Sequence, residues 1–218
     1  MPTASNTAPS TADPHASLPA SAAATPAPRL AGDMAMWLVI LLEMWTFGLM
    51  FIVFAFARIR ERALFDASQA TLDLQSGVLN TVLLLTGSWC MARAVHALRA
   101  QASSAVALRW LLGTLLCALG FMAQKTLEFN AKFDAGIDLS TNTFYTFYLM
   151  LAGFHYLHVA VATALIAYVA LRCARGAYAA GNVQLPESAA ALWHMVDLMW
   201  IVLFPLVWMV SVSFMATG

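Results

Sequence analysis

Five long apolar stretches occupy almost all of the chain after residue 33, and they constrain the fold more than any other feature. A bilayer core about 30 Å thick needs about 20 apolar residues to be crossed by a helix. The runs are too long for membrane strands and lack the strict alternation of a β-barrel. A helix also satisfies every backbone hydrogen bond within itself, as lipid demands. The sequence therefore predicts an all-α membrane protein, a five-transmembrane-helix bundle with helices at about 34–57, 74–98, 108–130, 142–172 and 189–216.

Composition and charge agree with this prediction. Hydrophobic residues make up 61% of the chain and charged residues 10%, whereas a soluble domain has roughly 25% charged residues. The formal net charge is zero, which gives no indication of a nucleic acid or an acidic substrate as a partner. The three cysteines are far apart and form no pair with metal-ligand spacing, so neither a disulfide framework nor a zinc site is expected.

The first 33 residues differ from the rest of the chain. They hold six of the eight prolines, among alanine, serine and threonine, and they lack an apolar core. We expect residues 1–33 to form a disordered tail, ahead of a transmembrane domain over residues 34–218. An odd number of helices places the chain ends on opposite sides. Six basic residues would lie on the N-terminal side and five on the other, which does not decide the orientation.

Ionisable residues within the apolar stretches are candidate functional residues, because a charged group in hydrocarbon is costly without a partner. Glu43 lies near the middle of the first stretch, and His155 and His158 lie near the middle of the fourth. The two histidines are three residues apart and share a helix face. We predict that Glu43 faces the fourth helix and pairs with His158 or His155. The alternatives are a structural hydrogen bond and a group that handles protons.

Two further pairs have the same spacing of three residues. His194 and Asp197 are expected to lie on the inward face of the fifth helix near one membrane surface, flanked by Trp193 and Trp200, where an imidazole next to a carboxylate would make both easier to bury. Lys125 and Glu128 are expected to pair at the end of the third helix. The basic segment at 58–62 is interpreted as a loop facing lipid headgroups.

Five strings in this order resemble subunit III of the haem–copper respiratory oxidases, over residues 34 to about 212. They include the helix with the buried Glu43, the string at 124–129 that contains Glu128, and two longer motifs. One of these is Gly-Phe-His-x-x-His-Val at 153–159, and the other is Trp-His-x-Val-Asp-x-x-Trp at 193–200. The resemblance implies a non-catalytic accessory subunit in a bacterial plasma membrane, with a cytoplasmic N-terminus. It would dock on the catalytic subunit and contact membrane lipids.

The resemblance also indicates a branch of that family. The mitochondrial-type subunit has seven helices, whereas five apolar stretches are found here. This five-helix form is similar to quinol oxidase subunit III and to the accessory protein of bacterial nitric oxide reductases. The segment 64–72 resembles the second of these more closely. The partner implied is therefore the catalytic subunit of a haem–copper oxidase or of a nitric oxide reductase.

No catalytic residue, cofactor or metal ligand is predicted within this chain. Two other functions stay open: a small transporter or channel built on the buried polar residues, and a haem b protein that uses His155 or His158 with His194 as axial ligands. Docking in lipid favours small residues at the contact. We therefore expect an outer face rich in small and hydroxyl residues, with these candidates: Thr81, Thr86, Gly87, Ser88, Gly113, Thr114 and Gly120. The alternative is that they pack inside the bundle.

Overall fold

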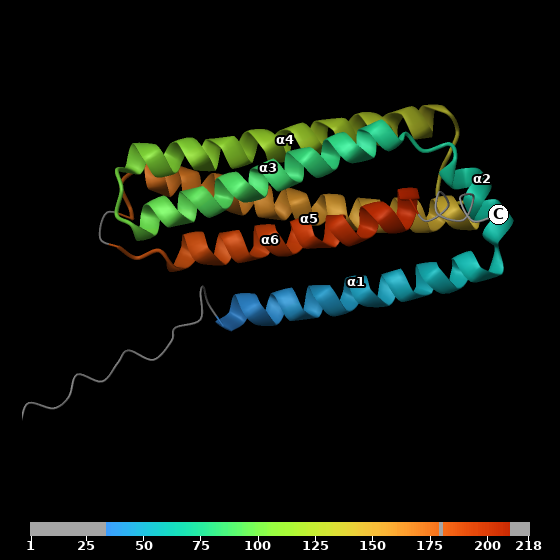
Figure 1. Ribbon diagram of the computed structural model, residues 1–218, viewed down its shortest axis with the longest axis horizontal. Helices are drawn as coiled ribbons and strands as arrows, with labels where there is room; N and C mark the ends of the chain where they lie inside the picture. The colour runs from blue at the N-terminus through green and yellow to red at the C-terminus, as the bar shows by residue number, and fades with distance from the viewer. Residues whose placement is uncertain (1–33, 179–180, 210–218) are drawn as a thin grey trace, which may run out of the picture.

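The computed structural model describes residues 34–178 and 181–209, and this part of the chain is all helical (Figure 1). Five of its helices are long and apolar enough to cross a membrane, which confirms the predicted fold class. The expected disordered tail lies outside the described residues. The elements in chain order are α1 (Met34–Arg60), α2 (Arg62–Gln69), α3 (Leu74–Arg99), α4 (Ser104–Asp134), α5 (Thr143–Ala174), α6 (Gln184–Phe204) and a π-helical turn, η1 (Pro205–Met209).

The basic segment at 58–62, interpreted from the sequence as a loop, forms the end of α1, a bend at Glu61 and the start of α2. Arg58 at the end of α1 donates hydrogen bonds to Asp66 at 2.9 Å and to Gln69 at 3.0 Å, both in α2. Phe65, one turn before Gln69 in α2, is fully buried, with its ring 5.3 Å from that of Phe54 in α1. The arginine is thus used to fold α2 back against α1 and is not left for the lipid headgroups.

Four helices, α3 to α6, pack together, and α1 lies along the edge of this bundle beside α6 and α5 (Figure 1). The α3–α4 contact is close because small residues meet there. A Cβ at Gly87 would lie 3.0 Å from the ring of Trp193 and 3.2 Å from Cys117, and Thr114 donates a hydrogen bond to the Gly87 carbonyl. A Cβ at Gly113 would lie 3.2 Å from the Cys90 sulfur.

These contacts correct the prediction of a small-residue outer face in part. Gly87 and Thr114 pack inside the bundle, and Thr81 accepts a hydrogen bond from the Trp200 indole at 3.0 Å. Thr86 is exposed, and Thr81, Ser88, Gly113 and Gly120 are partly exposed. Spacing along one helix could not show this, because it does not tell which side faces the neighbouring helices.

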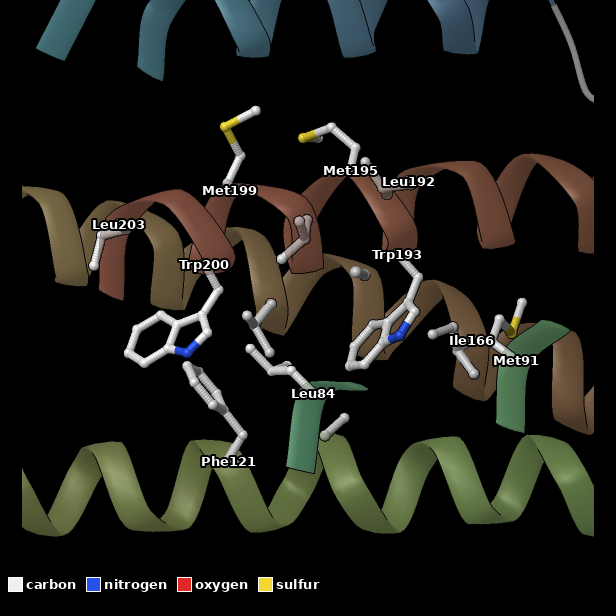
Figure 2. Packing of buried hydrophobic residues seen from close by; sticks show 14 of the residues in the cluster. Leu84, Met91, Phe121, Ile166, Leu192, Trp193, Met195, Met199, Trp200 and Leu203 are labelled. Carbon is white, nitrogen blue, oxygen red and sulfur yellow. The ribbon is translucent and has the colours of Figure 1, made fainter. Parts of the chain in front are cut away.

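The core lies between α6 and the other helices of the bundle, and Figure 2 shows its centre. Trp193 and Trp200 are fully buried and point from α6 toward α3 and α4, with the Phe121 ring against Trp200. Met195 and Met199 leave α6 on the opposite side, toward α1. One helix thus packs the bundle with its indole rings and meets α1 with flexible methionines.

The end of α6 is irregular at Pro205, where the sequence predicts a kink. Proline has no backbone N–H to donate, and the chain changes there from an α-helix to a π-helical turn. The Gln69 amide in α2 donates a hydrogen bond to the Val207 carbonyl at 2.8 Å and a longer one, at 3.5 Å, to that of Leu206. We call this contact the Gln69 latch. It joins the α1–α2 corner to the end of α6.

Candidate functional site

Glu43 and His158 form the first part of the candidate site. The Nε2 atom of His158 lies 3.0 Å from the Oε2 atom of Glu43, which confirms the predicted partner across α1 and α5. Both side chains are largely buried, with exposed fractions of 23% and 16% for Glu43 and His158. The distance is that of an ion pair, but the alignment falls short of a directed hydrogen bond.

The partner of the second His158 nitrogen, Nδ1, indicates which hydrogens the imidazole ring carries. Nδ1 lies 2.8 Å from the Phe154 carbonyl, which can only accept a hydrogen bond, so Nδ1 carries a hydrogen. In the neutral ring Nε2 is then bare and needs a donor. A hydrogen between Nε2 and Oε2 would come either from a protonated carboxyl group or from an imidazolium.

His155 points in a different direction from His158. It is fully buried, and its Nε2 atom donates a hydrogen bond to the Val196 carbonyl in α6 at 3.0 Å. Its ring lies 5.2 Å from Trp200 and 5.7 Å from Phe121. The two histidines of α5 therefore have separate partners, one on α1 and one on α6.

His194 and Asp197 are arranged differently from the prediction. Asp197 is buried, as expected, but His194 is exposed on the outer side of α6. The hydroxyl of Ser88 in α3 lies 2.6 Å from the His194 Nδ1 atom and is also a hydrogen-bond partner of Asp197. Asp197 Oδ1 has no hydrogen-bond partner among the described residues. The expected inward pair is thus a three-residue cluster that opens to the outside, and Ser88 links its members.

These groups lie at one depth in the bundle. Glu43 is opposite His158, His155 is opposite Val196, and the neighbouring His194 and Asp197 are opposite Ser88. Each residue is near the middle of its helix, so the predicted position of His194 and Asp197 near one membrane surface is wrong. The result is a polar layer that crosses the bundle parallel to the membrane. Such a layer does not favour a channel, because a channel needs its polar groups in series along the membrane normal.

A second polar cluster lies nearer the end of the bundle that holds α2. The predicted Lys125–Glu128 pair is confirmed, with a distance of 2.8 Å between the Lys125 nitrogen and the carboxylate. Lys125 is fully buried, and its ammonium lies 4.6 Å from the Trp208 ring and 5.3 Å from the Trp200 ring. The Tyr148 hydroxyl donates to the other oxygen of Glu128. The charges are therefore enclosed by aromatic faces and a hydroxyl, which lowers the cost of burying them.

Sequence reasoning missed Ser88 and Tyr148 as members of these clusters. Tyr148 is seven residues before His155, hence on the same face of α5, and this spacing could have indicated it. Ser88 carries no comparable signal, because a serine within an apolar helix usually bonds to its own backbone.

The chemistry available here is hydrogen bonding and proton holding. In the described part of the chain, no group of three or more histidine, cysteine or acidic side chains is placed to hold a metal ion. The Nε2 atoms of His155 and His158 are engaged with Val196 and Glu43, whereas His194 lies on the outer side of α6, so the histidines proposed for haem ligation do not face one another across a common site. The geometry therefore does not favour that alternative.

Comparison with known proteins gives a consistent result. The sequence profile of the family described as cytochrome c oxidase subunit III matches residues 33–212. A haem–copper oxidase subunit I+III of Aeropyrum pernix is 28% identical over 81% of this chain and 22% of its own length. A cytochrome c oxidase subunit 3 of Synechocystis is 32% identical over 63% of this chain and 58% of its own.

A quinol oxidase subunit 3 of Bacillus subtilis is also similar, being 26% identical over 62% of this chain and 66% of its own length. The chain thus spans less than two thirds of the length of the relatives from Aeropyrum and Synechocystis.

Proposed function

Because this chain belongs to the cytochrome c oxidase subunit III family, we propose that it is a non-catalytic accessory subunit of a respiratory haem–copper enzyme. Its partner would be the catalytic subunit, which it would contact sideways within the membrane and stabilise. We further propose that the complex lies in a bacterial plasma membrane, with the N-terminus of this chain in the cytoplasm and lipids against the outer face of α1.

The match of the family profile to residues 33–212 carries this proposal, since it covers every helix that the structure describes. The polar layer supports it in chemical terms. Its histidines are engaged in hydrogen bonds and an ion pair, and these contacts hold helices together. The Aeropyrum relative, whose name joins subunits I and III, supports subunit I as the partner.

The six ionisable residues singled out from the sequence have structural and proton-holding roles in this proposal. Glu43 and His158 share a proton and join α1 to α5, while His155 joins α5 to α6. Asp197 and His194 join α6 to α3 through Ser88, and Glu128 neutralises the buried Lys125.

Within the family, we propose the branch that accompanies bacterial nitric oxide reductases in denitrification. The support is the likeness of segment 64–72, which covers the last six residues of α2, Gln69 included, and the three residues that follow. An oxidase of cytochrome c or quinol is the other candidate, and the relatives from Synechocystis and Bacillus subtilis favour it.

The test is co-purification from native membranes. An affinity tag on this chain, after gentle solubilisation, should bring down haem-containing subunits, detected by their visible absorption spectrum and identified by mass spectrometry. Oxidase subunits and nitric oxide reductase subunits would distinguish the two branches. If this chain is recovered alone while the haem-containing subunits stay together, the accessory-subunit function is wrong.

A further inference from the structure

The side chain of His194 is exposed at the middle of the bundle, where lipid would surround a lone subunit. Its Nδ1 atom is bonded to Ser88, and Nε2 has no hydrogen-bond partner among the described residues. At the same depth the outer sides of α1 and α4 carry large apolar residues such as Trp45 and Leu116. His194 is therefore a polar group where the rest of the outer surface suits hydrocarbon.

Hydrocarbon cannot satisfy a ring nitrogen, and polar groups within a membrane usually face protein or water. His194 cannot turn inward without breaking its bond to Ser88, which also holds Asp197. The Nε2 atom is thus directed away from this chain, and its hydrogen-bond partner has to come from another molecule.

The surface around His194 would let a helix approach closely. Helix spacing places Ala191 and Leu198 beside His194 on α6, and Leu85 and Ala92 beside Ser88 on α3. All of them are exposed or partly exposed. We call these six residues the α3/α6 face; the two helices that carry it lie side by side in Figure 1. Small residues such as Ala191, Ala92 and Ser88, next to larger apolar ones, are typical of helix–helix contacts in lipid.

We propose that the α3/α6 face is the docking surface for a membrane-spanning helix of the catalytic subunit, which places a hydroxyl or carboxamide side chain against His194 Nε2. This inference rests on the proposed function. The protonation of Asp197 decides whether the chain of hydrogen bonds through Ser88 leaves Nε2 as an acceptor or as a donor. A hydroxyl or a carboxamide can serve in either case, whereas a side chain that only accepts or only donates cannot.

The first experiment replaces a leucine by the larger tryptophan, once on the α3/α6 face and once on the outer side of α4 as a control. Leu198→Trp lies on the α3/α6 face, and Leu116→Trp lies on the outer side of α4, where the native leucine is 74% exposed. We expect Leu198→Trp to reduce the haem recovered with the tagged chain at least about tenfold, a loss of binding free energy of about 1.4 kcal/mol, and Leu116→Trp to leave it unchanged. Equal recovery with both variants, or a loss with Leu116→Trp alone, would overturn the proposal.

The second experiment tests the hydrogen bond itself. His194→Gln keeps a group that can donate and accept, whereas His194→Leu removes it but suits lipid. We expect His194→Leu to lose the haem-containing subunits and His194→Gln to retain most of them, with both chains accumulating normally. If His194→Leu recovers as much haem as the wild type, the imidazole faces lipid and the proposal is wrong.

The outcomes separate this inference from the proposed function. A wild-type chain that recovers no haem contradicts the proposed function. A wild-type chain that recovers haem independently of Leu198 and His194 contradicts only the docking surface. Recovery of an untagged copy of this chain, lost in Leu198→Trp, would assign the face to self-association and overturn the proposal.

Discussion

Helices α1 and α6 show that apolarity and burial are different properties in this protein. The membrane-spanning part of α1 is the most hydropathic of the five, yet 17% of its residues are buried, against 61% for α6. In water the more apolar helix would be the more buried one. In lipid, hydrocarbon solvates leucine as well as a protein core does, so burial follows shape and polar contacts.

The two helices are accordingly held in different ways. α6 inserts Trp193 and Trp200 between its neighbours, and Gly87 leaves room for the first of these rings. α1 buries only Ile40, Phe47 and Phe54, and its position depends on the Glu43–His158 pair and on the Gln69 latch. Volume changes should therefore damage α6 most, and loss of polar contacts should damage α1 most.

The largest effect is expected for Trp200→Ala in α6. The change leaves a large cavity beside Phe121 and His155 and removes the indole bond to Thr81. We expect the free energy of unfolding to fall by about 3–5 kcal/mol, measured by denaturant titration in micelles. Trp45→Ala in α1, where the native side chain is 77% exposed, is the matched control and should change little. If both variants lost the same free energy of unfolding, the proposed difference between α6 and α1 would be wrong.

Glu43→Leu should come next. The change removes the partner of His158 and adds an apolar side chain. If only the transfer of apolar surface into lipid mattered, the protein would be stabilised. We expect a loss of about 1–3 kcal/mol, because Nε2 of His158 is left without a partner. Glu43→Gln should lose less, since an amide can still form the hydrogen bond. Stability of Glu43→Leu at or above the wild-type value would show that lipid contact alone holds α1.

Gln69→Ala should have a smaller effect, confined to the corner of α1 and α2. Losing the bond to the Val207 carbonyl is expected to cost about 0.5–1.5 kcal/mol. The separation of α1 from α6 can be followed with a pair of spin labels, one on each helix. Broader distance distributions are expected with the bundle of α3 to α6 unchanged. Ala63→Ser, at an exposed position of α2, serves as the control for a change within that helix.

The smallest effect is expected at Asp138, in the loop between α4 and α5 and outside the spans. Hydrogen bonds from Ser140 and Thr141 to its carboxylate hold the pKa of Asp138 below its usual value. A depressed pKa stabilises the fold above the unfolded pKa, and this contribution is lost as the pH falls through the folded pKa. Asp138→Ala should therefore matter slightly at neutral pH and not at all in strong acid. An unchanged difference at low pH would contradict this.

Much of the fold and some of the site could be predicted from the sequence. Hydropathy gave five spans, and spacing gave the Lys125–Glu128 pair because both residues belong to one helix. Glu43–His158 could be predicted because both residues are ionisable and lie at mid-helix. Ser88 and the Gln69 latch could not, since they depend on which helices become neighbours. The predicted inward position of His194 is wrong for the same reason. The sequence of α6 does not show which of its faces pack against α1 and α3 and which face lipid.

The Gln69 latch also has a consequence for the order in which the protein is made. Gln69 is separated by 138 residues from the carbonyl that it binds at Val207, and the ribosome adds about 5–20 residues each second. The hydrogen bond from Gln69 to the Val207 carbonyl therefore cannot form until four further helices have been synthesised and inserted. A chain that ends before Pro205 could insert its helices, but the Gln69 latch could not form, because Val207 would be absent.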